Sequence, residues 1–90
     1  MDALSGYFIS FEGSEGCGKT TQINALAKRL ESLGKTVLIT REPGGTLIGE
    51  KIRELLQDPQ NTNEISAMTE LLLFSASRSQ LISSVIRPAL

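Results

Sequence analysis

Eight residues near the start of the chain, Gly13-Ser14-Glu15-Gly16-Cys17-Gly18-Lys19-Thr20, match the pattern G-x-x-x-x-G-K-[ST] in full. In a chain of 90 residues, a chance match has odds of roughly a few in a thousand at average residue usage. Glycines let backbone N–H groups converge on phosphate oxygens, and the start of a helix adds a favourable dipole. The motif therefore predicts a loop between a strand and a helix that binds the phosphates of a nucleoside triphosphate.

Individual loop residues have distinct expected roles. The Lys19 ammonium is expected to reach the β- and γ-phosphates, and the Thr20 hydroxyl is expected to bind Mg²⁺. Glu15 places a carboxylate among phosphates, which is unfavourable unless it points towards an acceptor sugar or a metal; a solvated loop glutamate is the alternative. The predicted ATP-binding residues are Gly13, Ser14, Glu15, Gly16, Cys17, Gly18, Lys19, Thr20 and Thr21.

The flanking pattern fits such a loop. Residues 7–11 form an aromatic and β-branched run, and residues 37–40 are nearly all apolar, so both are predicted to be buried strands. Between them, apolar residues recur at helical spacing from Lys19 to Leu33, and Gly34 supplies the expected stop. Strand, glycine-rich turn, helix and strand together predict a βαβ unit.

The rest of the chain predicts helices. One has an apolar face that runs from Ile48 to Leu56, a polar loop follows at 57–63, and further helices are expected at about 64–79 and 80–90. The third helix is expected to bury Ile65, Met68, Leu72 and Ala76. The predicted fold class is α/β, a P-loop NTPase-type parallel sheet with flanking helices. Two strands and three to four helices do not close such a sheet, so residues 1–90 are expected to be the N-terminal part of one larger domain.

Composition restricts the partners. The formal net charge of −1 provides no basic field for nucleic acid. One cysteine and no histidine exclude a disulfide framework, a Cys-built zinc site and His-based catalysis. Apolar runs are far shorter than the roughly 20 residues of a membrane span, and no cationic N-terminal segment suggests a signal peptide. We expect a cytoplasmic protein without nucleic-acid or membrane partners.

Several stretches, in order, resemble bacterial thymidylate kinases. Besides the phosphate loop they are Phe8-Ile9-Ser10-Phe11-Glu12-Gly13, Thr40-Arg41-Glu42-Pro43-Gly44-Gly45-Thr46, Glu50-Lys51-Ile52-Arg53, Leu72-Leu73-Phe74-Ser75-Ala76-Ser77-Arg78 and Val85-Ile86-Arg87-Pro88-Ala89-Leu90. That family transfers the ATP γ-phosphoryl group to the 5′-phosphate of dTMP, which gives dTDP. The resemblance implies the same activity, with Mg²⁺ as cofactor, ATP and dTMP as small-molecule partners, and a homodimer in the full-length protein.

The resemblance also implies where the thymine base would lie. Phe74 would stack on the base and Arg78 would hydrogen-bond its polar edge. The two are four residues apart and hence neighbours on one helical face, where a planar guanidinium beside an aromatic ring suits a planar base. Glu42 and Pro43 would line the pocket. The alternatives are a core residue for Phe74 and a solvated surface charge for Arg78.

At the phosphate end, Arg53 resembles the arginine that meets the dTMP phosphate, although alone it is an ordinary helix surface charge. Glu15 resembles a loop carboxylate near the deoxyribose and its phosphate. With Lys19 these two make up the predicted catalytic set. Some members carry a loop arginine where this chain has Gly16, so the resemblance implies that the transition-state arginine comes from a mobile lid outside residues 1–90.

Two other functions compete with this prediction. One is a non-catalytic nucleotide-binding module, and the other is a different P-loop nucleoside monophosphate kinase. The Glu-Pro-Gly-Gly turn that begins at Glu42 and the pair Phe74 and Arg78 argue against the second. A P-loop GTPase is disfavoured because no guanine-reading Asn-Lys-x-Asp segment occurs.

Overall fold

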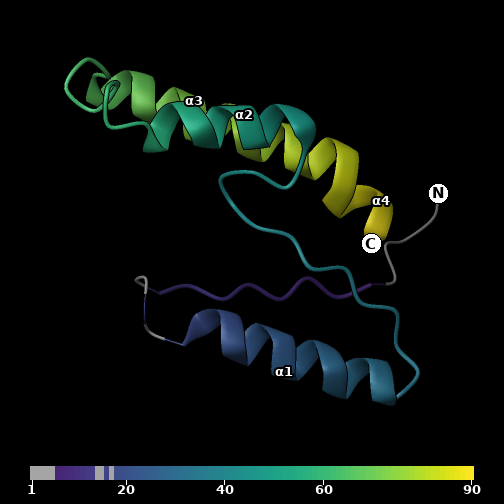
Figure 1. The fold of residues 1–90 in the computed structure, drawn as a ribbon. Helices are drawn as coiled ribbons and strands as arrows, with labels where there is room; N and C mark the ends of the chain where they lie inside the picture. Colours follow the sequence, from purple (N-terminus) through teal and green to yellow (C-terminus); the bar gives the residue numbers. More distant parts are fainter. Residues whose placement is uncertain (1–5, 14–15, 17) are drawn as a thin grey trace. The chain divides into compact units, whose positions relative to one another are not determined.

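The computed structural model describes residues 6–13, 16 and 18–90. The chain divides into two compact units. One consists of Tyr7–Ile39, and the other of Thr40–Leu90 together with Gly6. Helices supply the regular structure of the described residues in both units (Figure 1).

Helix α1, Lys19–Ser32, belongs to the first unit and begins and ends where the sequence predicts. Gly18 is its N-cap residue, with φ 84°. At the other end Gly34 has φ 83°, and its N–H donates to the Glu31 carbonyl at 3.0 Å. The next N–H, that of Lys35, donates to the Leu30 carbonyl at 3.1 Å. These bonds satisfy carbonyls that the last helical turn leaves without an intrahelical donor, so the glycine stop is confirmed.

The predicted α/β fold with a parallel sheet was wrong. Within the described residues neither 7–11 nor 37–40 is a β-strand, and no other strand is present. A strand exists only through hydrogen bonds to a neighbouring strand, and these two segments do not pair with each other. Their apolar side chains stay largely exposed, with Tyr7 93% and Leu38 61% accessible. The apolar, β-branched composition of residues 7–11 and 37–40 therefore led to a prediction of buried strands, but composition does not identify the second strand to which each must hydrogen-bond.

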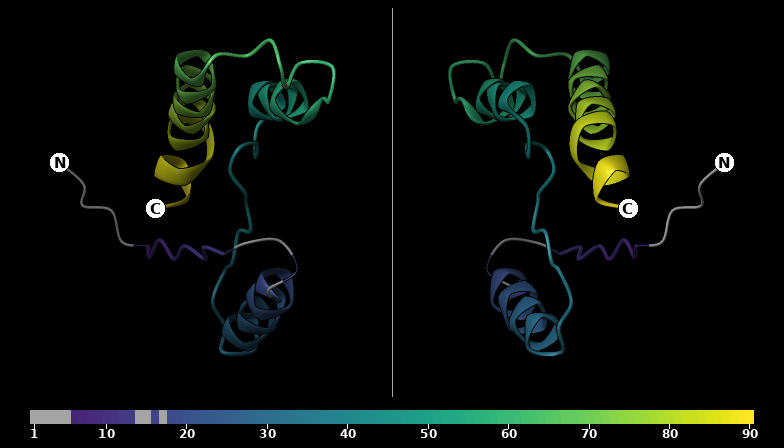
Figure 2. Two further views of the ribbon diagram at one scale, coloured as in Figure 1. Left: turned by 90° about the vertical axis from the view of Figure 1, so that its left-hand side faces the viewer. Right: turned by 90° about the vertical axis from the view of Figure 1, so that its right-hand side faces the viewer.

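The second unit contains a helical hairpin. Helices α2, Leu47–Gln57, and α3, Ala67–Leu81, pack against each other and run in opposite directions (Figures 1 and 2). Each begins at a hydroxyl cap: Thr46 Oγ1 accepts from the Gly49 N–H at 2.8 Å, and Ser66 Oγ accepts from the Thr69 N–H at 3.1 Å. Such caps satisfy one of the N–H groups that the first turn leaves without an intrahelical acceptor.

The described chain continues without a break after α3. A π-helical segment, Ile82–Ile86 (η1), follows directly, and the short helix α4, Arg87–Ala89, comes last. The two predicted helices at 64–79 and 80–90 are therefore one continuous helical stretch from Ala67 onward. Pro88 lies at the start of α4 but inside this continuous stretch, so its missing N–H removes one hydrogen bond to the preceding turn.

The buried face of α3 also differs from the prediction. Met68 and Leu72 are 63% and 60% accessible, whereas Ser77 and Leu81 are each only 1% accessible. Apolar residues occupy consecutive positions on α3, so helical spacing did not single out one face. The buried face of α3 is the one that contacts α2 and the turn at residues 41–45. On the α2 side of this contact, Ile52 is 9% accessible.

The Thr46 cap gives a direct test of this local structure. In the full-length protein, Thr46→Ala is expected to lower the free energy of unfolding by about 1 kcal/mol, because the Gly49 N–H loses its acceptor. Thr46→Ser keeps the hydroxyl and should lose much less. Urea unfolding of the two variants measures the difference, and equal losses would contradict a capping role.

Candidate functional site

The phosphate-loop motif leads directly into α1. Gly16 and Gly18 have φ values of 79° and 84°, a region that side chains with a Cβ rarely adopt. The Lys19 ammonium donates to the Gly13 carbonyl at 3.1 Å, which ties the two ends of the motif together. Ser14, Glu15 and Cys17 lie outside the described residues, so the predicted roles of these three are untested.

The first turn of α1 presents groups suited to anions. Thr20 and Thr21 are exposed there, and the first N–H groups of any helix have no intrahelical acceptor. Together with the positive end of the helix dipole, this is the arrangement that favours bound phosphate. Within the described residues no cluster of three acidic, histidine or cysteine side chains could hold a metal ion alone. The Thr20 hydroxyl, next to Lys19, suits a magnesium ion whose other ligands are phosphate oxygens and water.

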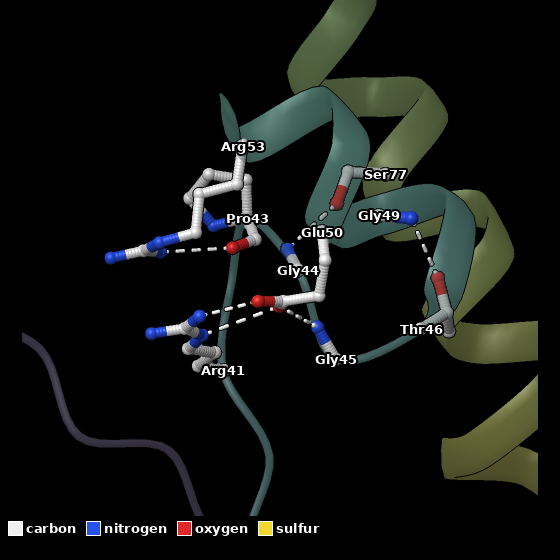
Figure 3. A network of polar contacts seen from close by, with 9 residues as sticks. All are labelled: Arg41, Pro43, Gly44, Gly45, Thr46, Gly49, Glu50, Arg53 and Ser77. Atoms are coloured by element: carbon white, nitrogen blue, oxygen red, sulfur yellow. Dashed lines mark hydrogen bonds and ion pairs between the residues drawn. The ribbon is translucent and has the colours of Figure 1, made fainter. Parts of the chain in front are cut away.

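In the second unit, the turn at residues 41–45 is held by side chains from both helices (Figure 3). The Gly44 N–H donates to Ser77 Oγ on α3 at 3.0 Å. The next N–H, that of Gly45, donates to Glu50 Oε2 on α2 at 2.8 Å. Arg41 forms an ion pair with the same carboxylate, and its Nε donates to Glu50 Oε2 at 3.3 Å. Two consecutive backbone amides are thus anchored to two different helices.

The same turn contacts two of the predicted site arginines. Arg53 on α2 donates from Nη1 to the Pro43 carbonyl at 2.9 Å, as Figure 3 shows. Arg78 on α3 donates from Nε and Nη2 to the two carboxylate oxygens of Glu42, both at 2.8 Å. A bidentate guanidinium–carboxylate pair fixes the plane as well as the position of the guanidinium. The turn therefore orients both arginines.

A pocket of about 140 Å³ opens beside this pair of charges. Its lining combines apolar and polar side chains, namely Glu42, Leu71, Phe74, Ser75 and Arg78. Phe74 is 42% accessible, so its ring is available to a ligand and is not buried in the core. An open aromatic ring beside an oriented guanidinium is suited to a flat molecule with polar atoms on its edge.

The contacts of residues 41–45 with Glu50, Arg53, Ser77 and Arg78 form what we call the turn network. Ion pairing sets the charge state of its two carboxylates, Glu42 and Glu50. The Arg41 hydrogen bond is the main reason that the pKa of Glu50 falls to about 2, and the Gly45 N–H lowers it further. The hydrogen bonds from Arg78 likewise lower the pKa of Glu42. The hydrogen bond with Glu50 in turn raises the pKa of Arg41. Both acids are therefore ionised at neutral pH.

The structure brings together one part of the predicted site and leaves another part untested. Glu42, Phe74 and Arg78 meet at one pocket, and Pro43 lies next to Arg53. Sequence reasoning missed Arg41, Glu50 and Ser77. A carboxylate in the first turn of a helix, shortly after two glycines, was a usable signal for Glu50, because the amides of such a turn need acceptors.

Comparison with known proteins identifies the family of this chain. The family model described as thymidylate kinase matches residues 11–90. The chain belongs to the thymidylate kinase family. The resemblance to this family inferred from the sequence is thereby confirmed, and every described residue of the pocket and of the turn network lies within the matched range.

Individual thymidylate kinases are similar over nearly all of this chain. The one from Pelobacter propionicus is 61% identical over 85 residues, which cover 94% of this chain and 38% of the relative. The one from Lactobacillus delbrueckii subsp. bulgaricus is 54% identical over 88 residues, covering 97% and 41%, and the one from Fervidobacterium nodosum is 59% identical over 83 residues, covering 92% and 40%. The chain thus spans about two fifths of the length of these thymidylate kinases. In the described residues no helix has the length and apolar character needed to cross a bilayer.

The low pKa of Glu50 gives a pH-dependent prediction. Its folded-state pKa of about 2 lies below the ordinary value of 4.5, so the ionised group stabilises the fold fully above that ordinary value. This contribution is lost as the pH falls towards 2. Glu50→Gln removes it at every pH. The difference in unfolding free energy between the unmodified full-length protein and Glu50→Gln should be widest above pH 5 and narrow steadily below pH 4.5.

Denaturant unfolding at several pH values measures this difference. Glu54→Gln is the matched control, since it removes the same charge from an exposed position one turn further along α2. A difference between the unmodified protein and Glu50→Gln that stays constant from pH 6 to pH 2.5 would contradict the assigned ion pair.

Proposed function

We propose that the full-length protein transfers the γ-phosphoryl group of ATP to the 5′-phosphate of dTMP, which yields ADP and dTDP. The pocket formed by Phe74, Arg78 and Glu42 carries the proposal, because it offers a ring and an oriented guanidinium to a planar base. Membership of the thymidylate kinase family supports the same reaction. The chain covers 38% to 41% of these relatives, so the reaction is proposed for the full-length protein.

The base end of the acceptor site follows from the pocket. Thymine would stack on the exposed ring of Phe74, and Arg78 would donate a hydrogen bond to an oxygen on the base edge. Glu42 keeps the guanidinium in place through two hydrogen bonds. Selection of the base then depends on a polar contact, and such contacts discriminate more strongly than apolar ones.

At the phosphate end, Arg53 is the proposed partner of the dTMP phosphate. One of its Nη atoms is committed to the Pro43 carbonyl, which fixes the side chain while leaving other guanidinium N–H groups for an anion. Glu15 is proposed to face the deoxyribose and the acceptor phosphate. A fixed cation limits the motion of the attacking oxygen, which is the positioning that phosphoryl transfer depends on.

The donor side is proposed to be the phosphate loop. Backbone amides from Gly13 to Thr21 would hold the ATP phosphates, and the Lys19 ammonium would move from the Gly13 carbonyl to the β- and γ-phosphates. Thr20 would hold Mg²⁺, which supplies charge neutralisation at the triphosphate when bound. An oxygen of the dTMP phosphate attacks the γ-phosphorus in line, and the bond from that phosphorus to the bridging oxygen of ADP breaks. No covalent enzyme intermediate is needed.

The reaction is tested with purified full-length protein, Mg-ATP and a panel of nucleoside monophosphates. Formation of dTDP, separated by chromatography, is expected to exceed the product from dCMP, AMP and GMP, and Lys19→Ala should abolish it. Binding of ATP without phosphorylation of any monophosphate would favour the non-catalytic module. A preference for another monophosphate would favour a different kinase of this class.

We also propose that the protein is cytoplasmic and a homodimer.

Arg78 is the residue on which base recognition should depend. Arg78→Ala is expected to raise the KM for dTMP by about ten- to hundredfold, the equivalent of a lost hydrogen bond to a charged group, and to change the KM for ATP little. Arg78→Lys should not restore recognition, because an ammonium cannot form the bidentate pair with Glu42. Steady-state kinetics with each substrate varied measures both constants. Equal increases for ATP and dTMP would indicate a purely structural role.

A further inference from the structure

The turn network contains two residues whose contacts connect α2 and α3 but which do not line the pocket. Ser77 on α3 accepts the Gly44 N–H at 3.0 Å, and Glu50 on α2 accepts the Gly45 N–H at 2.8 Å. Because the two amides are consecutive, they lie in adjacent planar peptide groups that are joined at the Gly44 Cα. A shift of either helix relative to the turn therefore strains the hydrogen bond on that side and displaces the neighbouring peptide group.

The flanking turn residues contact the substrate-site arginines. Glu42 holds Arg78 through two bonds at 2.8 Å, and the Pro43 carbonyl holds Arg53 at 2.9 Å. The two anchored amides follow immediately after these residues in the chain. Whatever fixes Gly44 and Gly45 therefore fixes how far apart Arg53 and Arg78 can lie.

Close packing leaves the turn little freedom to adapt. Ser77 is 1% accessible, and the bond that it accepts is buried. A Cβ atom at Gly49, in the first turn of α2, would lie 2.7 Å from the Gly44 carbonyl oxygen. At Gly45 a Cβ atom would lie 2.7 Å from Leu81 Cδ1. Both helices thus approach the turn too closely for a compensating shift.

We infer that Glu50 and Ser77 are positioning residues for the acceptor site, which set the separation between the phosphate-binding arginine on α2 and the base-binding arginine on α3. A nucleoside monophosphate of fixed length then matches both arginines at once. The inference rests on the proposed function. Glu50 and Ser77 then affect dTMP recognition through their bonds to Gly45 and Gly44, without contacting the substrate.

The test uses variants of the full-length protein. Glu50→Ala and Glu50→Gln alter the α2 contact, and Ser77→Ala removes the α3 contact. Glu54→Gln and Ser79→Ala are matched controls, because they change exposed residues of the same type on the same two helices. For each protein the kcat, the KM for dTMP, the KM for ATP and the midpoint of thermal unfolding are measured.

Glu50→Ala and Ser77→Ala are each expected to raise the KM for dTMP about tenfold, the equivalent of one lost hydrogen bond, with the KM for ATP within about twofold of the unmodified protein. Glu50→Gln keeps an oxygen that can accept the Gly45 N–H, so it should restore part of the loss. The double variant should fall short of the product of the single effects, because both contacts hold one turn. Glu50→Gln carries the test if Glu50→Ala does not fold.

Three outcomes overturn parts of the account separately. If the unmodified protein does not phosphorylate dTMP, the proposed function fails and this inference fails with it. If the unmodified protein is active but the variants match their controls in the KM for dTMP, only the inference fails. If the variants lower the unfolding midpoint and change both KM values equally, Glu50 and Ser77 are structural and the inference is again wrong.

Discussion

Two adjacent peptide N–H groups, those of Gly44 and Gly45, attach the turn at residues 41–45 to the helical hairpin. Each is satisfied by a side chain from a different helix, Ser77 on α3 and Glu50 on α2. The Gly44 contact is buried, and a buried amide without an acceptor costs about 1–3 kcal/mol, so these contacts favour one position of the turn on the hairpin. The pocket, the orientation of Arg78 and the placement of Arg53 all follow from that turn.

The turn also explains why glycine is needed at position 45, where the turn ends. Gly45 has φ 81°, and a Cβ atom there would approach both Leu81 and the Arg41 carbonyl, at 2.7 and 3.2 Å. A larger residue would have to separate the turn from α3, which would break the Gly44 contact with Ser77. The Glu-Pro-Gly-Gly sequence thus combines the Glu42 carboxylate, which orients the Arg78 guanidinium, with two glycines whose N–H groups bond to the helices.

Sequence reasoning predicted the grouping of Glu42, Phe74 and Arg78 at one pocket better than it predicted the fold. The spacing of Phe74 and Arg78 placed them on one helical face, and the helix from Lys19 to its glycine stop was predictable from local signals alone. The sheet was not, since residues 7–11 and 37–40 have strand-like composition but no hydrogen-bonding partner in the described chain. Local sequence specifies caps and turns, whereas a strand depends on a second segment that periodicity does not identify.

The same distinction applies to the missed residues. In the sequence, Glu50 and Ser77 look like ordinary polar surface positions of helices, because both bond to backbone amides. The partner of Ser77, the Gly44 N–H, is far away in sequence, and the partner of Glu50, the Gly45 N–H, lies just before the N-cap of α2. Backbone donors are identical at every residue and leave no pattern in the sequence that points to a distant acceptor such as Ser77. Only the arrangement of the turn against α3 shows that Ser77 accepts from it.

Native-state hydrogen exchange of the Gly44 and Gly45 amides tests this account most directly. Resolved by NMR in the unliganded full-length protein, both amides are predicted to exchange as slowly as those of α3 around the buried Leu81, because opening them requires separating the turn from both helices. Exchange as fast as that of the amides in the loop 58–66, whose residues are mostly exposed, would contradict the account, since the turn would then not be fixed before a substrate binds.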